Sequence, residues 1–494
     1  MIMKKVRYIA AFLGVIYFLI WNGSAIAGIP EYSCYRTVEE TYASAEAIVS
    51  QYPCLAAWID IGDSWDKTDP GGAAGYDLMV LKLTNVKISG PKPKLFISSS
   101  IHARDYAPAE ICTRLAEHLV ANYGLDPDIT WILDYQEIHL LLQGNPDARK
   151  YAEIGHSWVK NTNQNYCAPT SFDRGANLDH NFSFHWGCCG GSSGSQCDTE
   201  YRGPNPTSEP EVQALQGYLM SIYESRRPAD LSIPAPNDTP GLLIDLHSVS
   251  EQILWPWSFT SAEAPNSEAL QTLGRRLAYF NGYHPQQAIN NDPADGTAID
   301  YAYGEIGVPA YALYLGTDYF QDCTTFENII FPDILSTLIY TARVLRTPYL
   351  TPSGPEVIDV ALDDDDVVRG SVVRLSATID DTRQGDSGGS DPIQNIHSAE
   401  YFIDIPPWES DPATIGTVME ASDLVFDQTI EEVEATLDTA GMTVGKHILF
   451  LRGKDASGSY GPISAIFINI RKSIAMTGPI NLLLLIQDEQ PLTP

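Results

Sequence analysis

Three side chains of this sequence have the types and spacing of metal ligands. The segment "SSSIHARDYAPAE", residues 98–110, closes a short apolar run and places His102 and Asp105 three positions apart. A further histidine, His247, ends the apolar run "LLIDLH". A hydrolytic zinc site takes three such protein ligands and leaves one position open. A lone histidine here would be a structural hydrogen-bonding residue, but three candidates at strand ends predict a metal site.

Alternating strands and helices are expected to position these side chains. The runs "KLFISSSI", "QEIHLLLQ", "GLLIDLHS" and "VPAYALYLG" read as buried strands. Helices are expected over "APAEICTRLAEHLVANYG" and around 209–224, 266–281 and 324–346. This alternation predicts an α/β domain with a mainly buried central sheet, and ligands of such sheets bind where strands end. His102 and His247 lie at such ends.

The charge balance excludes some classes of partner. The 494 residues contain 63 Asp and Glu against 30 Lys and Arg, a formal net charge of −33. Nucleic acid and anionic membranes require basic surfaces, so we expect neither as a partner. The acidity itself is typical of a well-solvated surface. The length allows two or three domains of ordinary size.

The N-terminus has the pattern of an export signal. Lys4 and Arg7 lie in a basic start, the apolar run "YIAAFLGVIYFLIW" follows, and "AIA" ending at Ala27 matches a cleavage site. The alternative is an uncleaved membrane anchor, but residues 8–21 are short for a spanning helix. We therefore expect a signal peptide over residues 1–27, a secreted or periplasmic chain, and no stable membrane span after cleavage.

The cysteines agree with export. The chain has eight, and an even number in an exported protein predicts disulfides, with the pairing left open. The alternative is a zinc site around Cys188, Cys189 and Cys197, which lack paired C-x-x-C spacing. The Gly/Ser/Asn-rich stretch 187–206 is expected to form a long loop held by its cysteines.

The pattern changes after a Pro-rich linker at residues 348–356. Short β-type runs separated by turns follow without cysteine, and they predict an all-β immunoglobulin- or fibronectin-like sandwich over residues 357–471. The acidic run 363–366 is expected to be a solvated loop, with a calcium site as the alternative. The tail, residues 472–494, is too short to span a bilayer. A spacer and a binding module are both open roles for this domain.

Many short phrases of residues 28–347 occur together in one known family. They are, in chain order, "IHAR", "NPD", "WVKN", "GANLDHNFSFHWG", "CCGGSSG", "YRGP", "SEPE", "DLHS", "WPW" and "LGT". With their spacing, they resemble the zinc carboxypeptidases of the carboxypeptidase A and T type, peptidase family M14. The appended sandwich resembles secreted bacterial members. The resemblance implies a mixed central β-sheet flanked by helices, a Zn²⁺ cofactor, and a peptide or protein C-terminus as substrate or ligand.

The resemblance places the metal ligands on His102, Asp105 and His247. The family's set is His-x-x-Glu and a later His, so Asp105 stands where the family has Glu. Aspartate is a competent zinc ligand, but its stem is one methylene shorter. The start of the helix must then shift for the carboxylate to reach the zinc ion, or the carboxylate binds the ion through a water molecule. We expect the metal affinity to be weakened rather than abolished.

Further departures fall on positions to which the resemblance assigns catalysis. Tyr314, in "YALYLGT", takes the place of the family's catalytic Glu, and a phenol with a pKa near 10 is a poor base. Val159, in "WVKN", replaces the Arg that stabilises the oxyanion, a donor whose loss typically costs about 10²–10³ in rate. The Asn-Arg pair that grips the substrate carboxylate becomes Asp179 and His180 in "NLDHNF".

Two more positions complete the predicted substrate site. The family's capping Tyr, counted back from the "DGT" turn, falls on Asp292. The Arg beside the ligand pair is retained as Arg104. We therefore expect Arg104, Asp179 and His180 to contact a substrate or ligand.

Because the departures from the family fall at catalytic positions, two main interpretations of the function are open. The first is a catalytically impaired or inactive carboxypeptidase-like protein, a pseudoenzyme that holds zinc and binds a peptide or a related ligand. The second is an active zinc-dependent carboxypeptidase or amidase with remodelled residues, in which Asp179, His180, Glu251 or Asp292 serves as the base. An ordinary carboxypeptidase, with these positions aligned wrongly, is the third alternative. The oligomeric state is left open.

Overall fold

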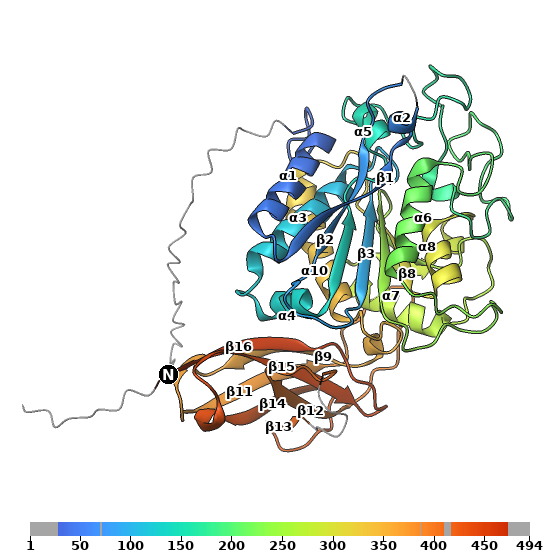
Figure 1. The fold of residues 1–494 in the computed structure, drawn as a ribbon. Helices are drawn as coiled ribbons and strands as arrows, with labels where there is room; N and C mark the ends of the chain where they lie inside the picture. Colours follow the sequence, from blue (N-terminus) through green and yellow to red (C-terminus); the bar gives the residue numbers. More distant parts are fainter. Residues whose placement is uncertain (1–27, 70–71, 386, 410–415, 473–494) are drawn as a thin grey trace, which may run out of the picture.

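The computed structural model describes residues 28–69, 72–385, 387–409 and 416–472. The predicted signal peptide and residues 473–494 of the predicted tail lie outside these ranges. The chain forms an α/β body and, below it in Figure 1, a body built of strands. Within the described ranges, no helix has both the length and the apolar character that a membrane span requires.

The α/β body is built on an eight-stranded mixed sheet in the order β1-β2-β4-β3-β5-β8-β6-β7. Its strands are β1 (Ala56–Asp63), β2 (Asp77–Leu83), β3 (Lys94–Ser99), β4 (Glu137–Leu141), β5 (Leu242–His247), β6 (Gln252–Trp255), β7 (His284–Gln287) and β8 (Ala310–Tyr314). The central strands β4, β3, β5 and β8 run parallel. Parallel strands are covered on both faces, which explains why the four predicted strands read as continuous apolar runs.

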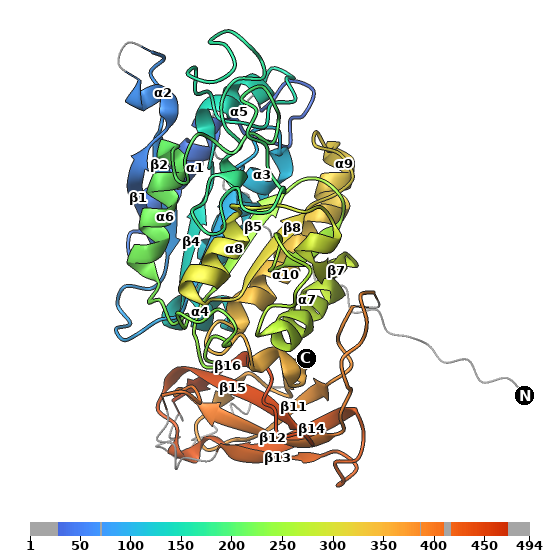
Figure 2. The ribbon, with the colours of Figure 1, turned by 90° about the vertical axis from the view of Figure 1, so that its right-hand side faces the viewer.

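Helices pack against both faces of this sheet (Figures 1 and 2). They are α1 (Val38–Gln51), α2 (Trp65–Thr68), α3 (Tyr106–Asn122), α4 (Pro127–Tyr135), α5 (Pro146–Ala152), α6 (Pro210–Ile222), α7 (Ser267–Asn281), α8 (Ala298–Tyr301), α9 (Cys323–Thr325) and α10 (Phe331–Arg343). The four predicted helices are present. The last differs from expectation, because a π-helical turn at Phe326–Ile330 separates α9 from α10.

Three disulfides hold the loops of the α/β body. They join Cys34 to Cys323, Cys167 to Cys197, and Cys188 to its neighbour Cys189. The bond to Cys197 anchors the long loop predicted at 187–206. Because all three cysteines of the alternative zinc site are bonded to other cysteines, they do not form that site. Two cysteines of the described chain, Cys54 and Cys112, remain thiols.

The second body is all-β, as predicted, in the order β10-β16-β15-β12-β13-β14-β11-β9. Its strands are β9 (Glu356–Leu362), β10 (Asp366–Val368), β11 (Val372–Asp380), β12 (Ile396–Ile403), β13 (Thr417–Ala421), β14 (Ile430–Asp438), β15 (Gly445–Asp455) and β16 (Ser464–Arg471). β13 pairs with β12 through one half and with β14 through the other, so it joins two layers. Leu375 of β11 and Leu449 of β15 share the core between these layers.

Candidate metal centre and the cavity above it

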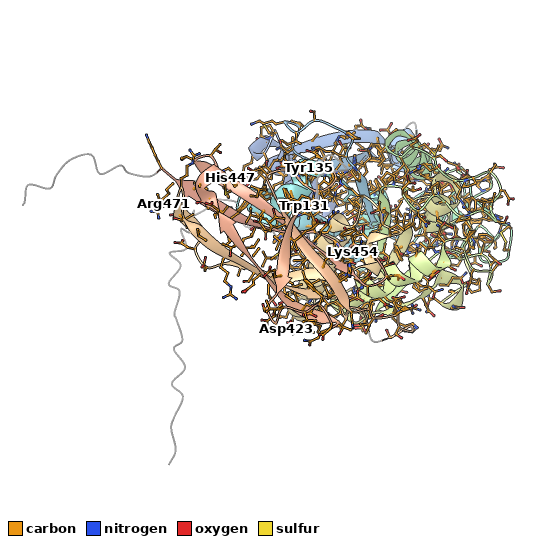
Figure 3. The ribbon with its side chains drawn as sticks, turned by 90° about the horizontal axis from the view of Figure 1, so that it is seen from below. Trp131, Tyr135, Asp423, His447, Lys454 and Arg471 are labelled. Atoms are coloured by element: carbon orange, nitrogen blue, oxygen red, sulfur yellow. A yellow bond between two sulfur atoms is a disulfide. The ribbon has the colours of Figure 1, made fainter. Side chains whose placement is uncertain are left out.

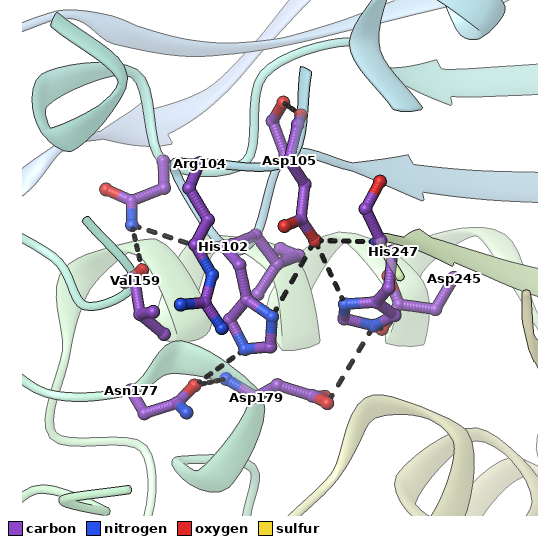
Figure 4. Close-up of polar contacts among 12 residues, drawn as sticks. His102, Arg104, Asp105, Val159, Asn177, Asp179, Asp245 and His247 are labelled. Atoms are coloured by element: carbon purple, nitrogen blue, oxygen red, sulfur yellow. Dashed lines mark hydrogen bonds and ion pairs between the residues drawn. The ribbon is translucent and has the colours of Figure 1, made fainter. Parts of the chain in front are cut away.

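The carboxyl ends of β3 and β5 bring the three predicted ligands together. The strands pair Ser99 with Leu246, and His247 is the last residue of β5. His102 lies in the turn after β3, and Asp105 is the residue that precedes α3. The Nδ1 atoms of both histidines lie 3.8 Å from Oδ2 of Asp105 (Figure 4). One ligand atom from each residue therefore falls within 4.8 Å of the other two.

Hydrogen bonds determine which nitrogen of each histidine faces this cluster. Nε2 of His102 lies 3.1 Å from Oδ1 of Asn177, whose Nδ2 donates to Glu200. Nε2 of His247 lies 3.0 Å from Oδ2 of Asp245. Since both partners are oxygen acceptors, the neutral rings carry hydrogen on Nε2 and present the lone pair of Nδ1. An outer acceptor of this kind is the usual partner of a metal-binding histidine.

Two buried atoms of the cluster lack the partner that a cation would supply. Oδ2 of Asp105 accepts the N–H of Ser248 at 3.0 Å. Among the described residues, however, neither Oδ1 of Asp105 nor Nδ1 of His247 has a hydrogen bond, although both residues are fully buried. A buried polar atom without a partner costs about 1–3 kcal/mol. Two imidazole nitrogens and one carboxylate form a donor set that suits zinc, so these residues fit the ion.

Charge around His247 supports the same assignment. Burial lowers the pKa of this ring, but the nearby carboxylates of Asp245, Asp179 and Asp105 outweigh it and raise the pKa to about 10. Burial raises the pKa of Asp105 to about 6. Burial, helped by the charge of His247, holds the pKa of His102 well below its ordinary value. The metal-free cluster therefore holds a proton on His247, which a cation would displace.

Asp179 lies beside the cluster, on the far side of His247. Its Oδ2 lies 3.8 Å from Nε2 of His247, and its Oδ1 accepts the N–H of Ala298 at 3.1 Å. With Asp245 and His247 it forms a second group of possible ligand atoms. Burial and the charge of Asp245 raise the pKa of Asp179 to about 6. At neutral pH this carboxylate opposes the approach of another anion.

His180 is held between two acceptors of its own protein. Nδ1 lies 3.0 Å from the backbone oxygen of Asp295, and Nε2 lies 2.8 Å from Oε2 of Glu200. Both nitrogens therefore donate. Burial lowers the pKa of His180, but the hydrogen bond to Glu200 and the neighbouring carboxylates outweigh it and raise the pKa. A cation is thus retained where the resemblance places Arg, but both of its N–H groups are already used.

Tyr314 covers the candidate metal ligand His247. The two residues face each other across β5 and β8, and their rings stack with centroids 5.0 Å apart at 17°. Burial, followed by the charge of Asp179, raises the pKa of the Tyr314 phenol well above its ordinary value. The phenol therefore stays neutral at physiological pH and cannot serve as a proton acceptor there.

Val159 and Arg104, two further predicted positions, differ in the side-chain hydrogen-bond donors that they offer a ligand. Val159 is buried, and its backbone oxygen accepts hydrogen bonds from Ala103 and Asn145 at 3.4 and 3.3 Å. Its side chain offers no donor. The Arg104 guanidinium lies 3.6 Å from the ring centroid of Tyr319 and donates to Ser157 at 3.3 Å.

A cavity of about 610 Å³ opens above the metal cluster. Its lining includes His102, Arg104, Asp179, His180, Asp292 and Tyr314. Asp292 is exposed, whereas Glu251 is not part of the lining. Three of the four alternative bases therefore face the cavity. Asp198, Glu200 and Asp245 also line it, so most of its charged groups are carboxylates.

Sequence reasoning missed the residues that hold the ligands in place. Asn177 and Asp245 could have been found from the sequence, since each lies within a few residues of a predicted site residue. Glu200 carried none, because it comes from the middle of the long loop. Asp295 was also missed: its carboxylate accepts the N–H groups of Cys189 and Gly191, at 3.2 and 3.1 Å, and so organises the loop that walls the cavity.

Comparisons with known proteins agree with this geometry. The family model for zinc carboxypeptidase, Peptidase_M14, matches residues 41–331. A zinc carboxypeptidase of Saccharothrix mutabilis subsp. capreolus is 28% identical in an alignment of 293 positions that covers 55% of this chain and 60% of that protein. Carboxypeptidase B2 of Homo sapiens is 30% identical in an alignment of 289 positions that covers 55% of this chain and 61% of that protein.

Solved structures support the fold alone. Thrombin activatable fibrinolysis inhibitor superposes with a TM-score of 0.54 at 23% identity, over 63% of this chain and 74% of that one. Carboxypeptidase A of Helicoverpa armigera superposes with a TM-score of 0.52 at 20% identity, over 62% of this chain and 72% of that one. Since the family model covers more than half of the sequence, the chain belongs to the zinc carboxypeptidase family. It spans only about 60% of the length of its curated relatives.

Proposed function

We propose that this chain is a secreted, zinc-binding carboxypeptidase-like protein that binds a peptide or a related ligand and has lost most or all of the family's catalysis. His102, Asp105 and His247 would hold the ion. The predicted export signal and the disulfides support secretion.

One observation carries the proposal: the ligand set is assembled, but the phenol of Tyr314 lies where the resemblance places the base. When bound, zinc polarises a carbonyl and lowers the pKa of water, but hydrolysis also needs a proton acceptor and an oxyanion donor. Tyr314 has a raised pKa and cannot accept a proton at neutral pH. Val159 contributes no donor from its side chain.

The charges of the cavity favour a ligand whose bound end carries no free carboxylate. Asp179 presents a negative charge beside His247, and His180 has both N–H groups bonded to Asp295 and Glu200. A bidentate grip of the kind that Arg gives a carboxylate is therefore missing from these positions. An amide or amine end would meet less repulsion there.

The test is a cleavage assay on the zinc-loaded, disulfide-bonded protein with a mixed peptide library, read by mass spectrometry. We expect no loss of C-terminal residues even when zinc binding is demonstrated separately. Single-residue losses that a chelator abolishes would overturn the proposal. The double variant Tyr314→Glu, Val159→Arg is the matched gain-of-function arm, and an inactive result there would show that further positions are also defective.

The second candidate is an active enzyme with a remodelled base, and Asp179 is the observation that favours it. Its carboxylate lines the cavity, lies 3.8 Å from Nε2 of His247 and has a pKa raised to about 6. A carboxylate with a raised pKa is suited to general base catalysis near neutral pH. If any cleavage is found, Asp179→Asn should abolish it, whereas Asp292→Asn, at the exposed rim, should leave most of it.

A further inference from the structure

A fully buried arginine contacts the turn that carries two of the candidate metal ligands. Arg149 belongs to α5, and none of its surface is exposed. Its Nη1 donates to the backbone oxygen of Asp105 at 2.9 Å and to Oγ of Ser100 at 3.5 Å. Oγ of Ser100 donates to the same backbone oxygen at 3.2 Å. The guanidinium and the hydroxyl therefore hold one carbonyl group, that of Asp105.

The partners of Arg149 are uncharged groups, which is unusual for a buried arginine. Its Nε and Nη2 have no hydrogen bond among the described residues, so its contacts run through Nη1. The charge of Glu153 acts on it, but that carboxylate is bonded to Lys150 and to the N–H of Val38. A buried charge is costly unless it is paired or well bonded. An arginine kept at this position indicates that the place of the carbonyl it holds matters.

The side chain of Asp105 is not used in the way that its position predicts. It lies directly before α3, where an aspartate usually caps the helix, yet it makes no capping bond. Its Oδ2 lies instead 3.8 Å from Nδ1 of each candidate histidine ligand (Figure 4). Because aspartate is one methylene shorter than glutamate, its carboxylate reaches the cluster from a narrower range of backbone positions. Arg149 and Ser100 fix that backbone in the absence of the cap.

The helix that carries Arg149 is itself braced against the same turn. The hydroxyl of Tyr106, the first residue of α3, donates to the backbone oxygen of Ala152 at the end of α5. Nδ2 of Asn145, just before α5, donates to the backbone oxygen of Ile101 at 3.1 Å. The guanidinium of Arg149 lies 4.3 Å from the ring centroid of Tyr106. These contacts make α5 a firm support for the turn.

We propose that Arg149 is a positioning residue of the candidate metal centre: its guanidinium fixes the backbone of Asp105 so that the short carboxylate faces His102 and His247 instead of capping α3. The inference rests on the proposed function, since it takes these three residues as the zinc ligands. Arg149 does not line the cavity, so it acts on the ligand set and does not contact a bound peptide.

The test measures the zinc affinity of the full-length protein by competition with a fluorescent chelator. Arg149→Met keeps an unbranched stem but removes the guanidinium, and it should weaken zinc binding about 10–100-fold, as the loss of an outer support of a metal site does. Arg149→Lys keeps a charge and a donor, and it should lose less. The visible spectrum of bound Co²⁺, which depends on the ligands and their geometry, should also change in Arg149→Met.

Arg276 of α7 is the matched control, because it is also a buried arginine bonded to backbone oxygens. Its Nε donates to Pro352 at 2.9 Å, and its Nη1 donates to Arg383 at 2.6 Å. It lies at the contact between the two bodies, which Figure 3 views from the strand side, with Trp131 and Tyr135 of α4 labelled near the strands. Arg276→Met should lower the free energy of unfolding but leave the zinc affinity and the Co²⁺ spectrum unchanged.

A double-mutant cycle with Asp105→Glu separates positioning from general stability. The longer and more flexible glutamate can reach the ion from several backbone positions, so Arg149→Met should then weaken zinc binding by less than about threefold. An arginine that only stabilises the fold would cost the same affinity in both backgrounds. If Arg149→Met does not fold, Arg149→Lys takes its place in the same cycle.

Three results would overturn the inference. They are an unchanged zinc affinity in the folded Arg149 variants, an equal loss whether residue 105 is Asp or Glu, and a matching loss in Arg276→Met, which destabilisation alone would explain. A parent protein that binds no zinc would overturn the proposed function and this inference with it. A parent protein that binds zinc regardless of residue 149 would overturn this inference alone.

Discussion

Two parts of one cavity depart from the family's residues to different degrees. We call them the floor, which holds the candidate metal ligands, and the wall, which rises beside them. The floor is the metal cluster, in which His102, Asp105 and His247 converge and each histidine is oriented by an outer acceptor. The wall carries Tyr314, which resemblance assigns to the base, whereas Val159, which resemblance assigns to the oxyanion donor, is not part of the cavity lining. Tyr314 stacks on His247, and Val159 is an apolar side chain in a buried position.

The floor offers residues that can bind a metal ion, whereas the wall lacks the residues that would let a bound ion take part in catalysis. Positioned acids and bases typically contribute about 10²–10⁴ to a rate, and an oxyanion donor contributes about 10²–10³. If both kinds of group are lost, as we propose, the cavity would still present a bound ion to a ligand. A protein under selection for binding alone would keep the metal ligands of the floor and lose the catalytic side chains of the wall.

The largest effect is expected from His247→Gln, which removes a ligand from the floor. The zinc affinity should fall by more than the roughly 100-fold that loss of an outer partner can cause. Competition with a fluorescent chelator measures it. His118→Gln, in α3 and outside the cluster, is the matched control and should leave the affinity unchanged. A loss below tenfold for His247→Gln would mean that the ion binds elsewhere.

A smaller effect is expected from Asp245→Asn, which changes only the outer partner of His247. The neutral amide is a weaker acceptor for Nε2, so the ring becomes a poorer ligand, and the zinc affinity should fall about 10–100-fold. Asp292→Asn alters a cavity carboxylate at the exposed rim and serves as the control in the same chelator assay. Equal affinities for the two variants would contradict the orienting role of Asp245.

The pH dependence of zinc binding should follow the proton on His247. Between pH values of about 6 and 10, the ring is protonated in the free protein and deprotonated when bound, so one proton is released per ion. The affinity should therefore rise about tenfold per pH unit in that window, and more steeply below about 6, where Asp105 is also protonated. Calorimetry in buffers of different ionisation enthalpy counts the protons. A flat profile would refute the assignment.

The floor could be predicted from the sequence because its residues lie at or just after the ends of strands that the sequence marks clearly. Continuous apolar runs predicted the parallel strands β3 and β5, and parallel strands deliver the residues at their ends to one edge of the sheet. His247 is therefore placed by the end of β5, and His102 and Asp105 by the turn between β3 and α3. The disulfide of neighbouring Cys188 and Cys189 could not be predicted, since eight cysteines allow many pairings.

The surroundings of the site could not be predicted, because they are made by residues distant in the chain. Glu200 reaches His180 and Asn177 from a long loop whose path depends on Asp295 and on a disulfide. The contact between the two bodies is a similar case. Arg346 and Trp408 are brought together only by the packing of β-strands against α4 and the end of α10, and no motif marks that contact.

The smallest effect is expected from Tyr314→Phe, and it tests whether the wall is inert. The described contacts give the hydroxyl of Tyr314 no hydrogen bond, while its ring stacks on His247 and would remain as Phe. Zinc affinity should therefore change by less than about twofold, and the free energy of unfolding by less than about 0.5 kcal/mol. Chelator competition and denaturant unfolding measure the two quantities. If the library assay detects cleavage in the parent protein and this variant abolishes it, the phenol takes part in the reaction, and the floor and the wall would have to be treated as one active site.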